Sequence, residues 1–154
     1  MCGIAAIFHG SGSEAAFLAE IDGMVSRLRH RGPDARGTWT DAAAGVALGH
    51  ARLSILDLSE AGSQPMVSGC GRWAISYNGE VYNFADLKKE LAERGHAFRG
   101  NSDTEVALAA IAEWGVEKAL GRFVGMFAFA LWDRQERRLW LGRDRLGIKP
   151  LYYG

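Results

Sequence analysis

Cys2 is the residue of this sequence with the clearest capacity for covalent chemistry. If Met1 is removed, Cys2 carries both a thiol and a free α-amine, so a nucleophile and a base belong to one residue. Nucleophiles that use an N-terminal amine as their base form covalent acyl intermediates. Most cysteines near an N-terminus have no such role. The hypothesis therefore depends on whether the chain supplies the other groups that acyl transfer needs.

The first of these groups is a pair of hydrogen-bond donors for the oxyanion that forms on the substrate. Asn78-Gly79 would supply a side-chain amide and an unobstructed main-chain N–H at the end of a predicted strand. The alternative is that Asn-Gly is only a turn dipeptide, which is its commonest role in an arbitrary sequence.

Three charged residues could recognise a free amino acid as the substrate. Arg52 is suited to bind an α-carboxylate through two parallel hydrogen bonds. Glu80 and Asp103 could pair with an α-ammonium group. Each also has an ordinary interpretation, since Arg52 could be a surface strand residue and Asp103 a first-turn acid favoured by a helix dipole.

Hydrophobic periodicity predicts the elements that hold these residues. Apolar residues at helical spacing, with Ser13 as N-cap, and the Ser-x-x-Glu capping box of Ser102–Glu105 mark two of three predicted helices. The predicted helices lie around 17–28, 84–94 and 102–114, and the predicted strands around 3–8, 38–40, 46–55, 72–77, 126–132 and 138–142.

Two of the strands have patterns that bear on the fold. Along 46–55, Val46, Leu48, His50, Arg52 and Ser54 would share one face, so the histidine and arginine are either solvated or directed inward with a function. The segment 126–132 is apolar on both faces, which is typical of a central strand covered on both sides. Together with the order of the elements, this predicts an α+β layered sandwich rather than alternating βαβ units.

Composition excludes several functional classes. Eighteen basic and eighteen acidic residues give a formal net charge of zero, which offers no electrostatic basis for binding nucleic acid or an anionic membrane. No apolar run approaches the roughly 20 residues of a membrane span, and no secretory signal is visible. Two cysteines, Cys2 and Cys70, are too few for a disulfide framework or a metal cluster, although a bridge between them stays open. A reducing cytoplasm is the predicted location.

Seven motifs occur in the order found in one known family, and they are distributed along the chain from residue 2 to residue 153. They are Cys2-Gly3-Ile4, His30–Asp34, His50–Ile55, Asn78-Gly79-Glu80, Ser102–Glu105, Gly125–Phe129 and Arg143–Tyr153. The chain thereby resembles the class II glutamine amidotransferase domain of the asparagine synthetase B family. Its arginine motif and its Arg-Asp-x-Leu-Gly-Ile-x-Pro-Leu-Tyr segment resemble this branch more than the glucosamine-phosphate synthase or purine amidotransferase branches.

The resemblance implies a fold and a set of roles. The fold would be that of an N-terminal-nucleophile (Ntn) hydrolase, a four-layer αββα sandwich of two antiparallel sheets between helices. Cys2 would be the nucleophile, its α-amine the proton shuttle, and Asn78 and Gly79 the oxyanion hole. The glutamine-binding residues would be Arg52, Leu53, Ile55, Asn78, Gly79, Glu80 and Asp103.

The resemblance also implies partners. Residues 1–154 would form a glutaminase domain that binds L-glutamine and needs no cofactor. ATP and Mg²⁺ would belong to a synthetase domain, or a separate synthetase chain, that amidates aspartate or another acid, and its Ser-Gly-Gly-x-Asp-Ser loop does not occur in this sequence. Two alternatives are a non-catalytic glutamine-binding or regulatory module and a structural module that partners a synthetase. An apolar surface left by a missing domain could also support a homo-oligomer.

Overall fold

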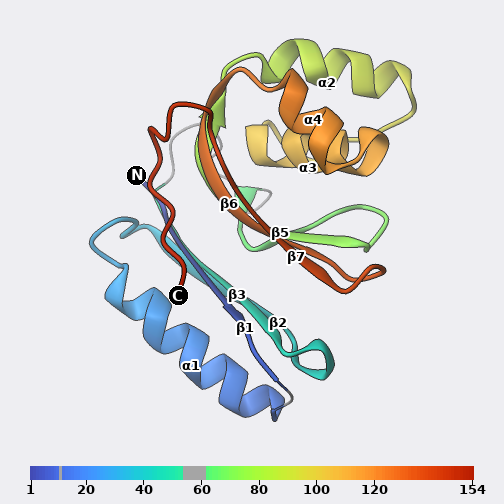
Figure 1. Cartoon of the computed structure of the whole chain (residues 1–154). Helices are drawn as coiled ribbons and strands as arrows, with labels where there is room; N and C mark the ends of the chain where they lie inside the picture. Colours follow the sequence, from blue (N-terminus) through green and yellow to red (C-terminus); the bar gives the residue numbers. More distant parts are fainter. Residues whose placement is uncertain (11, 54–61) are drawn as a thin grey trace.

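The computed structural model of the chain describes residues 1–10, 12–53 and 62–154. Two antiparallel sheets form its centre (Figure 1). The first sheet has the strand order β1-β3-β2, with β1 at Gly3–Phe8, β2 at Ala35–Asp41 and β3 at Val46–Arg52. The second has the order β4-β5-β6-β7, with β4 at Met66–Val67, β5 at Trp73–Val81, β6 at Gly125–Asp133 and β7 at Arg138–Arg143.

Helices cover the outer face of each sheet (Figure 1). Helix α1 (Glu14–Arg27) packs on the first sheet, while α2 (Phe84–Glu93), α3 (Asp103–Trp114) and α4 (Val116–Arg122) pack on the second. A 3-10 turn, η1 (Ala42–Ala44), joins β2 to β3. The predicted α+β layered sandwich is therefore confirmed, with its layers in the order helix, sheet, sheet, helix.

Three apolar cores hold the four layers together. Phe17, Ile21 and Val25 of α1 pack on the alternate residues of β1 and β3 that face them. Gly49 of β3 lies on this face, where a Cβ atom would come within 2.4 Å of Val25 Cγ2, so α1 can approach the strand closely. Between the sheets, Val46 and Leu48 of β3 meet residues of β5 and β6.

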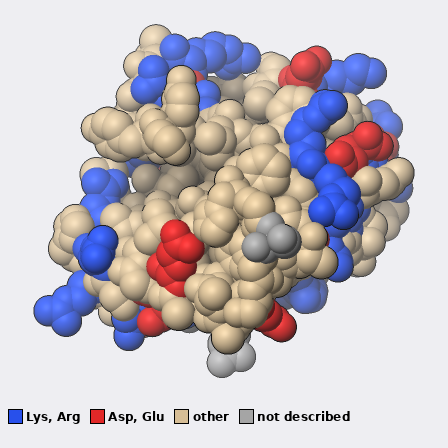
Figure 2. All heavy atoms as spheres, turned by 60° about the horizontal axis from the view of Figure 1, so that its bottom comes forward, with Lys and Arg blue, Asp and Glu red and all other residues tan. Residues whose placement is uncertain are grey.

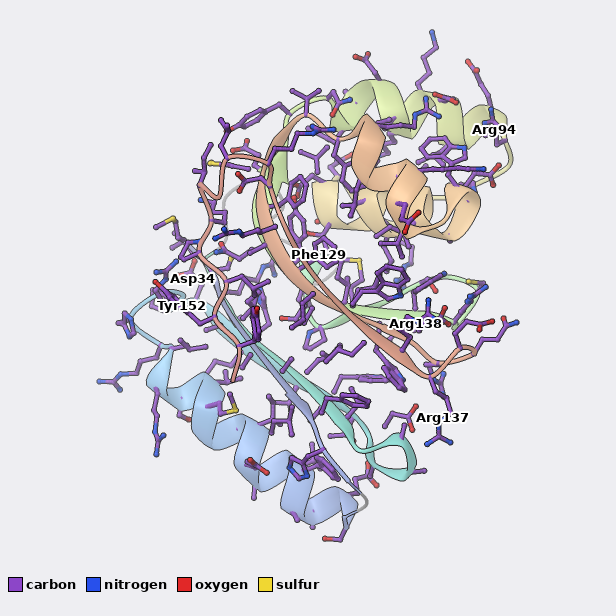
Figure 3. The ribbon with its side chains drawn as sticks, viewed as in Figure 1. Asp34, Arg94, Phe129, Arg137, Arg138 and Tyr152 are labelled. Atoms are coloured by element: carbon purple, nitrogen blue, oxygen red, sulfur yellow. The ribbon has the colours of Figure 1, made fainter. Side chains whose placement is uncertain are left out.

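The third and largest core lies between the second sheet and its helices. Phe129 projects from β6 into this core (Figure 3), and the whole of β6 from Phe127 to Asp133 is buried. The prediction of a central strand covered on both sides is thus confirmed. On the surface, basic and acidic side chains are interspersed over the face seen in Figure 2, in keeping with the zero net charge. None of the helices in the described ranges is long and apolar enough to cross a membrane.

The two serines predicted to cap helices, Ser13 and Ser102, do so, while Glu105 of the predicted capping box accepts the N–H groups of Arg99 and Gly100. The Ser13 hydroxyl accepts a hydrogen bond from the Ala16 N–H, and the Ser102 hydroxyl accepts one from the Thr104 N–H. Asn83 does not cap α2 with its side chain. Its amide instead binds the Arg122 carbonyl and the Val124 N–H, because α4, which the sequence pattern did not predict, ends beside the start of α2.

The prediction that Asn78-Gly79 stands at the end of a strand was wrong. Strand β5 continues to Val81, and Asn78 and Gly79 pair with Ala128 and Phe127 of β6. A turn role for this dipeptide is therefore excluded. A Cβ atom on Gly79 would come within 2.4 Å of Met126 O and 2.5 Å of Phe127 Cβ, so close contact with β6, rather than a turn, requires glycine here.

Candidate active site

The predicted site residues come from four elements. Cys2 immediately precedes β1, Arg52 ends β3, Asn78, Gly79 and Glu80 belong to β5, and Asp103 begins α3. Gly3 pairs with Ala51, so Cys2 and Arg52 lie at the same end of the first sheet. Figure 3 shows Asp34, whose N–H binds the Arg52 carbonyl at 3.0 Å, at this end of the molecule and Arg137 at the opposite end.

Hydrogen bonds across the gap between the sheets bring β5 to this end. The Ser76 hydroxyl donates to the Gly49 carbonyl at 2.7 Å, and His50 Nε2 lies 3.1 Å from the Tyr77 carbonyl oxygen. Strands β3 and β5 therefore run alongside each other in the same direction. Arg52 lies two residues beyond His50 on β3, and Asn78-Gly79 directly follows Tyr77 on β5. Because side chains alternate along a strand, Asn78 and Glu80 face the first sheet as Ser76 does.

The thiol of Cys2 lies against the main chain of Leu53. The Leu53 N–H donates to Cys2 Sγ at 3.4 Å, and Sγ lies 3.6 Å from the Leu53 carbonyl oxygen. Cys2 is half-buried, and Arg52, the residue before Leu53, is almost fully buried. The nucleophile candidate and the carboxylate-binding candidate are thus joined through one dipeptide. Ile55, also predicted to line the pocket, lies outside the described residues.

The loop at His30–Asp34 packs on the end of β3, at Ala51 and Arg52. A Cβ atom on Gly32 would lie 2.2 Å from the Ala51 carbonyl oxygen, so only glycine allows the loop to approach β3 this closely. The His30–Asp34 motif therefore has a structural role, because it packs on the end of β3 at Arg52.

Main-chain donors of β5 line the edge of the strand next to β4. Three odd-numbered residues of β5 show which groups point to this edge. The Trp73 carbonyl accepts the Ser68 N–H, the Tyr77 N–H donates to Gln64, and the Val81 N–H donates to Asp103. The odd-numbered residues therefore direct their N–H and C=O groups to this edge. Gly79 lies between Tyr77 and Val81 and, by the same alternation, directs its N–H to this edge. The Asn78 side chain, nearly buried, projects from the face toward the first sheet.

Glu80 and Asp103 form an acidic pair next to these donors. Burial raises the pKa of Asp103 above its usual value, and the Glu80 charge adds to this, although N–H groups of Val81 and Thr104 oppose it by donating hydrogen bonds. Within the described residues, neither carboxylate forms a salt bridge with lysine or arginine. Two acids so close together favour a cation between them.

The C-terminal segment runs past the N-terminus (Figure 1). Lys149 Nζ lies 3.1 Å from Met1 Sδ, and Met1 carries the α-amine in this sequence. Asp144 holds this segment in place, because its carboxylate accepts hydrogen bonds from the N–H groups of Phe127, Leu146, Ile148 and Lys149. The Arg143–Tyr153 motif therefore forms one wall of the region around Cys2.

Cys70 lies apart from this site. Both cysteines are free thiols, so the bridge that the sequence left open is not formed. A hydrogen bond with the Ser68 hydroxyl lowers the pKa of the Cys70 thiol. Cys70 borders a cavity of about 980 Å³ between the 63–70 segment and α3, whose lining includes none of the predicted site residues.

Sequence reasoning did not assign a role to two residues that the structure brings to the site. His50 was predicted to be either solvated or directed inward with a function, and it is buried, but the sequence named no partner for it. Gln64 had no signal, because it lies in an irregular segment and its partners, Tyr77 and Thr104, come from distant parts of the chain.

Comparison with known proteins bears on this arrangement. The whole chain, residues 1–154, matches the family model described as the glutamine amidotransferase domain. The chain belongs to this family. Among solved structures, the glutamine phosphoribosylpyrophosphate (PRPP) amidotransferase from Bacillus subtilis, complexed with ADP and GMP, superimposes with a TM-score of 0.69. It is 21% identical in sequence, and the match covers 92% of this chain and 37% of that one. The predicted Ntn-hydrolase fold is thereby confirmed.

Curated relatives of this amidotransferase domain are longer proteins. It is 41% identical to asparagine synthetase [glutamine-hydrolyzing] 3 of Bacillus subtilis over 99% of this chain and 25% of that protein. It is 42% identical to asparagine synthetase B of Escherichia coli over 100% of this chain and 27% of that protein. Amidase chry2 of Gibberella zeae is 41% identical over 99% of this chain and 24% of its own length. The chain spans about a quarter of the length of these relatives.

Proposed function

We propose that this chain is the glutaminase half of a glutamine-hydrolysing synthetase, with Cys2 as the nucleophile that attacks the side-chain amide of L-glutamine. The observation that carries the proposal is the position of Cys2 Sγ, which lies against the main chain of Leu53, next to Arg52. This is the end of the space between the two sheets where β5 presents Asn78 and Gly79. Family membership supports the same chemistry.

The first step is proton transfer within Cys2. Once Met1 is removed, the neutral α-amine takes the thiol proton, directly or through one water molecule. Amines and thiols of this kind both titrate within about two pH units of neutrality, so the transfer costs little free energy. The main chain of Leu53 orients the thiol, because its N–H donates to Sγ and its carbonyl oxygen lies 3.6 Å from Sγ.

The second step is attack on the amide carbon of glutamine. The C–S bond forms as the carbonyl electron pair moves onto oxygen, and the oxyanion lies between the Asn78 amide and the Gly79 N–H. The ammonium of Cys2 then protonates the departing nitrogen, which leaves as ammonia, and a γ-glutamyl thioester remains. Water, deprotonated by the same amine, hydrolyses the thioester and releases glutamate.

Charge complementarity selects glutamine. Arg52 binds the α-carboxylate, and Glu80 with Asp103 binds the α-ammonium, whose charge compensates for the burial and the Glu80 charge that raise the pKa of Asp103. The main chain of Leu53 borders the pocket between them. Asparagine is one methylene shorter and a blocked glutamine lacks one charge, so both should be poor substrates.

The acceptor of the ammonia follows from the relatives. The names of the bacterial relatives support aspartate, and the fungal relative, named an amidase, leaves another acid as the second candidate. We assign ATP and Mg²⁺ to a synthetase domain or partner chain and no cofactor to this domain. The two free thiols support a cytoplasmic location.

The decisive experiment measures ammonia released from L-glutamine and identifies the N-terminal residue of the same sample by mass spectrometry. We expect Cys2 at the N-terminus and ammonia release that Cys2→Ala abolishes while glutamine binding is retained. Glutamine binding without ammonia release by the unmodified chain would favour the non-catalytic alternative, and neither binding nor release would favour the structural one. Full activity with Met1 retained would contradict the amine as base.

A further inference from the structure

Among the described residues, the edge of β5 that carries Gly79 has a neighbouring strand only at Ala74 and Ile75, which pair with the two residues of β4. From Tyr77 onward, the main-chain groups directed to this edge have no β-ladder partner within 62–154 or the described part of the first sheet. Buried N–H and C=O groups without a partner are costly, so other groups must take the place of the strand.

Two side chains take that place at Tyr77. Gln64 Oε1 accepts the Tyr77 N–H at 2.7 Å, and His50 Nε2 contacts the Tyr77 carbonyl oxygen at 3.1 Å. Since a carbonyl oxygen can only accept, the imidazole proton is on Nε2. Both polar groups of Tyr77 are thus held by side chains directly before Asn78.

His50 makes this hydrogen bond as a neutral imidazole at neutral pH. Its side chain is 1% exposed, and burial lowers the pKa of His50 to about 4. The hydrogen bond to Tyr77 opposes this shift, and the Arg52 charge adds to it. Burial of a histidine at the centre of the protein costs free energy, so its position there calls for a compensating role.

The same contacts join the other parts of the site. The Ser76 hydroxyl, fully buried, donates to the Gly49 carbonyl, so β3 and β5 are linked twice, just before Arg52 on one strand and just before Asn78 on the other. Gln64 Nε2 donates to the Thr104 hydroxyl at 3.3 Å, and Thr104 follows Asp103. One short network therefore connects β3, β5 and the start of α3.

We propose that His50 and Gln64 are positioning residues that hold the main chain of Tyr77 in place and thereby fix the Asn78 and Gly79 donors relative to Cys2 and Arg52. The inference rests on the proposed function. Oxyanion donors act because they are already oriented before the reaction, so a backbone that moves by a fraction of an ångström weakens them. Neither side chain needs to touch glutamine for this effect.

The test compares variants that remove or keep the donor of His50. His50→Leu should lower kcat about tenfold to 10²-fold, the range for small misplacement of catalytic groups, with KM for glutamine within about threefold. His50→Gln keeps an N–H donor near the position of Nε2 and should restore most of kcat. Gln64→Leu should reproduce the kcat loss, because it releases the N–H of the same residue, Tyr77.

Ser68→Ala is the matched control. Ser68 supports the same edge of β5, where its hydroxyl accepts the Trp73 N–H at 3.1 Å, but it lies at the end remote from Asn78. Ser68→Ala should lose about as much thermal stability as His50→Leu and Gln64→Leu, but its kcat should stay within about twofold of that of the unmodified chain. The reason is that misplacement of the oxyanion donors, and not a loss of stability, is expected to lower kcat. All rates are divided by the fraction of Cys2 labelled by a diazoketone analogue of glutamine, so misfolded protein does not lower kcat.

A double-mutant cycle separates positioning from general damage. If His50 acts through Asn78, His50→Leu should cost less than about threefold in an Asn78→Ala background, since coupled residues are not additive. An equal cost in both backgrounds, an unchanged kcat in His50→Leu, or an equal loss in Ser68→Ala would overturn the inference.

Failure of the proposed function has a different signature. If the unmodified chain releases no ammonia, the proposed function fails, and the positioning role is then read from the amide resonances of Asn78 and Gly79 by NMR. They should shift and broaden more in His50→Leu and Gln64→Leu than in Ser68→Ala. Equal changes in the three variants would overturn the positioning role as well.

Discussion

The Asp103 carboxylate accepts a hydrogen bond from the Val81 N–H at 2.9 Å, which ties the first residue of α3 to the last residue of β5. This contact holds the acidic pair of Asp103 and Glu80 beside the oxyanion donors of the strand. It also buries a carboxylate whose pKa is raised by burial, so the charged form of Asp103 is disfavoured until a cation binds. Stability and glutamine binding should therefore respond to Asp103 in opposite directions.

We expect Asp103→Asn to raise KM for glutamine about 10²-fold, because a charged hydrogen bond to the ammonium, worth about 1.5–3 kcal/mol, is lost. The free protein should be as stable as the unmodified one or more stable, since Asn can accept the Val81 N–H without a buried charge. An acid with a raised folded pKa loses stability as pH rises through that pKa. The advantage of Asp103→Asn in thermal melts without glutamine should thus grow from acidic to neutral pH.

Asp86→Asn is the control for this prediction, since Asp86 is an exposed acid in the first turn of α2. It should leave KM unchanged. A KM for Asp103→Asn equal to that of the unmodified chain would remove Asp103 from the ammonium site.

Asn78→Ala should lower kcat about 10²–10³-fold, the usual effect of removing one oxyanion donor, and should change KM much less. The oxyanion forms only after attack, so its donors act on the transition state rather than on bound glutamine. Steady-state kinetics of ammonia release separate the two constants. Asn83→Ala, which removes an amide from the α2–α4 contact, should reduce stability without affecting kcat. An effect of Asn78→Ala confined to KM would assign Asn78 to substrate binding instead.

The layers of the fold could be predicted because their signals are local. The apolar run of β6 is a property of a short segment, and it was confirmed. Val46 and Leu48 share the face of β3 toward the second sheet, as the alternation predicted, although every residue of β3 is buried. Ser54, the last residue of that pattern, lies outside the described residues. Helix α4 was missed because it has only seven residues and follows α3 after a single glycine, Gly115, at φ 80°. The predicted strand ended too early at residue 77, because Asn-Gly favours a turn. In the structure, pairing with β6, which is distant in sequence, outweighs that preference, and β5 continues to Val81.

The site was only partly predictable for the same reason. Residue types at Cys2 and Arg52 indicate their chemistry, but their meeting depends on the β1–β3 register and on Leu53, which touches the Cys2 thiol. The contact of Gln64 with Tyr77 is possible because β4 begins only at Met66, which pairs with Ile75. No pattern near Gln64 contains that information.

Burial of neutral His50 should make the protein less stable as pH falls. Its pKa is lowered from 6.5 to about 4, so the unfolded chain binds a proton more readily between these values. The free energy of unfolding should therefore decrease as pH falls from about 7 toward 4, by up to roughly 3 kcal/mol for this group. Urea unfolding at several pH values measures this, and His50→Gln should show a flatter dependence. Parallel curves for the two proteins would mean that His50 titrates normally in the folded state.

The pair of Arg72 and Asp133 should govern the stability of the opposite end of the molecule. The Asp133 side chain is 2% exposed and accepts hydrogen bonds from Arg72 Nε at 2.9 Å and Arg72 Nη2 at 2.6 Å, and also from two N–H groups of the β6–β7 turn. Burial alone would raise the pKa of Asp133, but these hydrogen bonds outweigh it and lower the pKa.

We expect Asp133→Asn to reduce the free energy of unfolding at neutral pH by about 2–3 kcal/mol, below the 3–5 kcal/mol typical of a broken buried pair because Arg72 stays partly hydrated. An acid with a lowered folded pKa loses its contribution as pH falls through that pKa, so the difference between the two proteins should shrink in acid. Ammonia release per folded molecule should not change, because this hairpin lies at the end opposite Cys2. Glu136→Gln, in the exposed part of the same turn, should change stability by less than about 0.5 kcal/mol. A stability difference that persists undiminished in strong acid would show that the loss is one of packing rather than of charge.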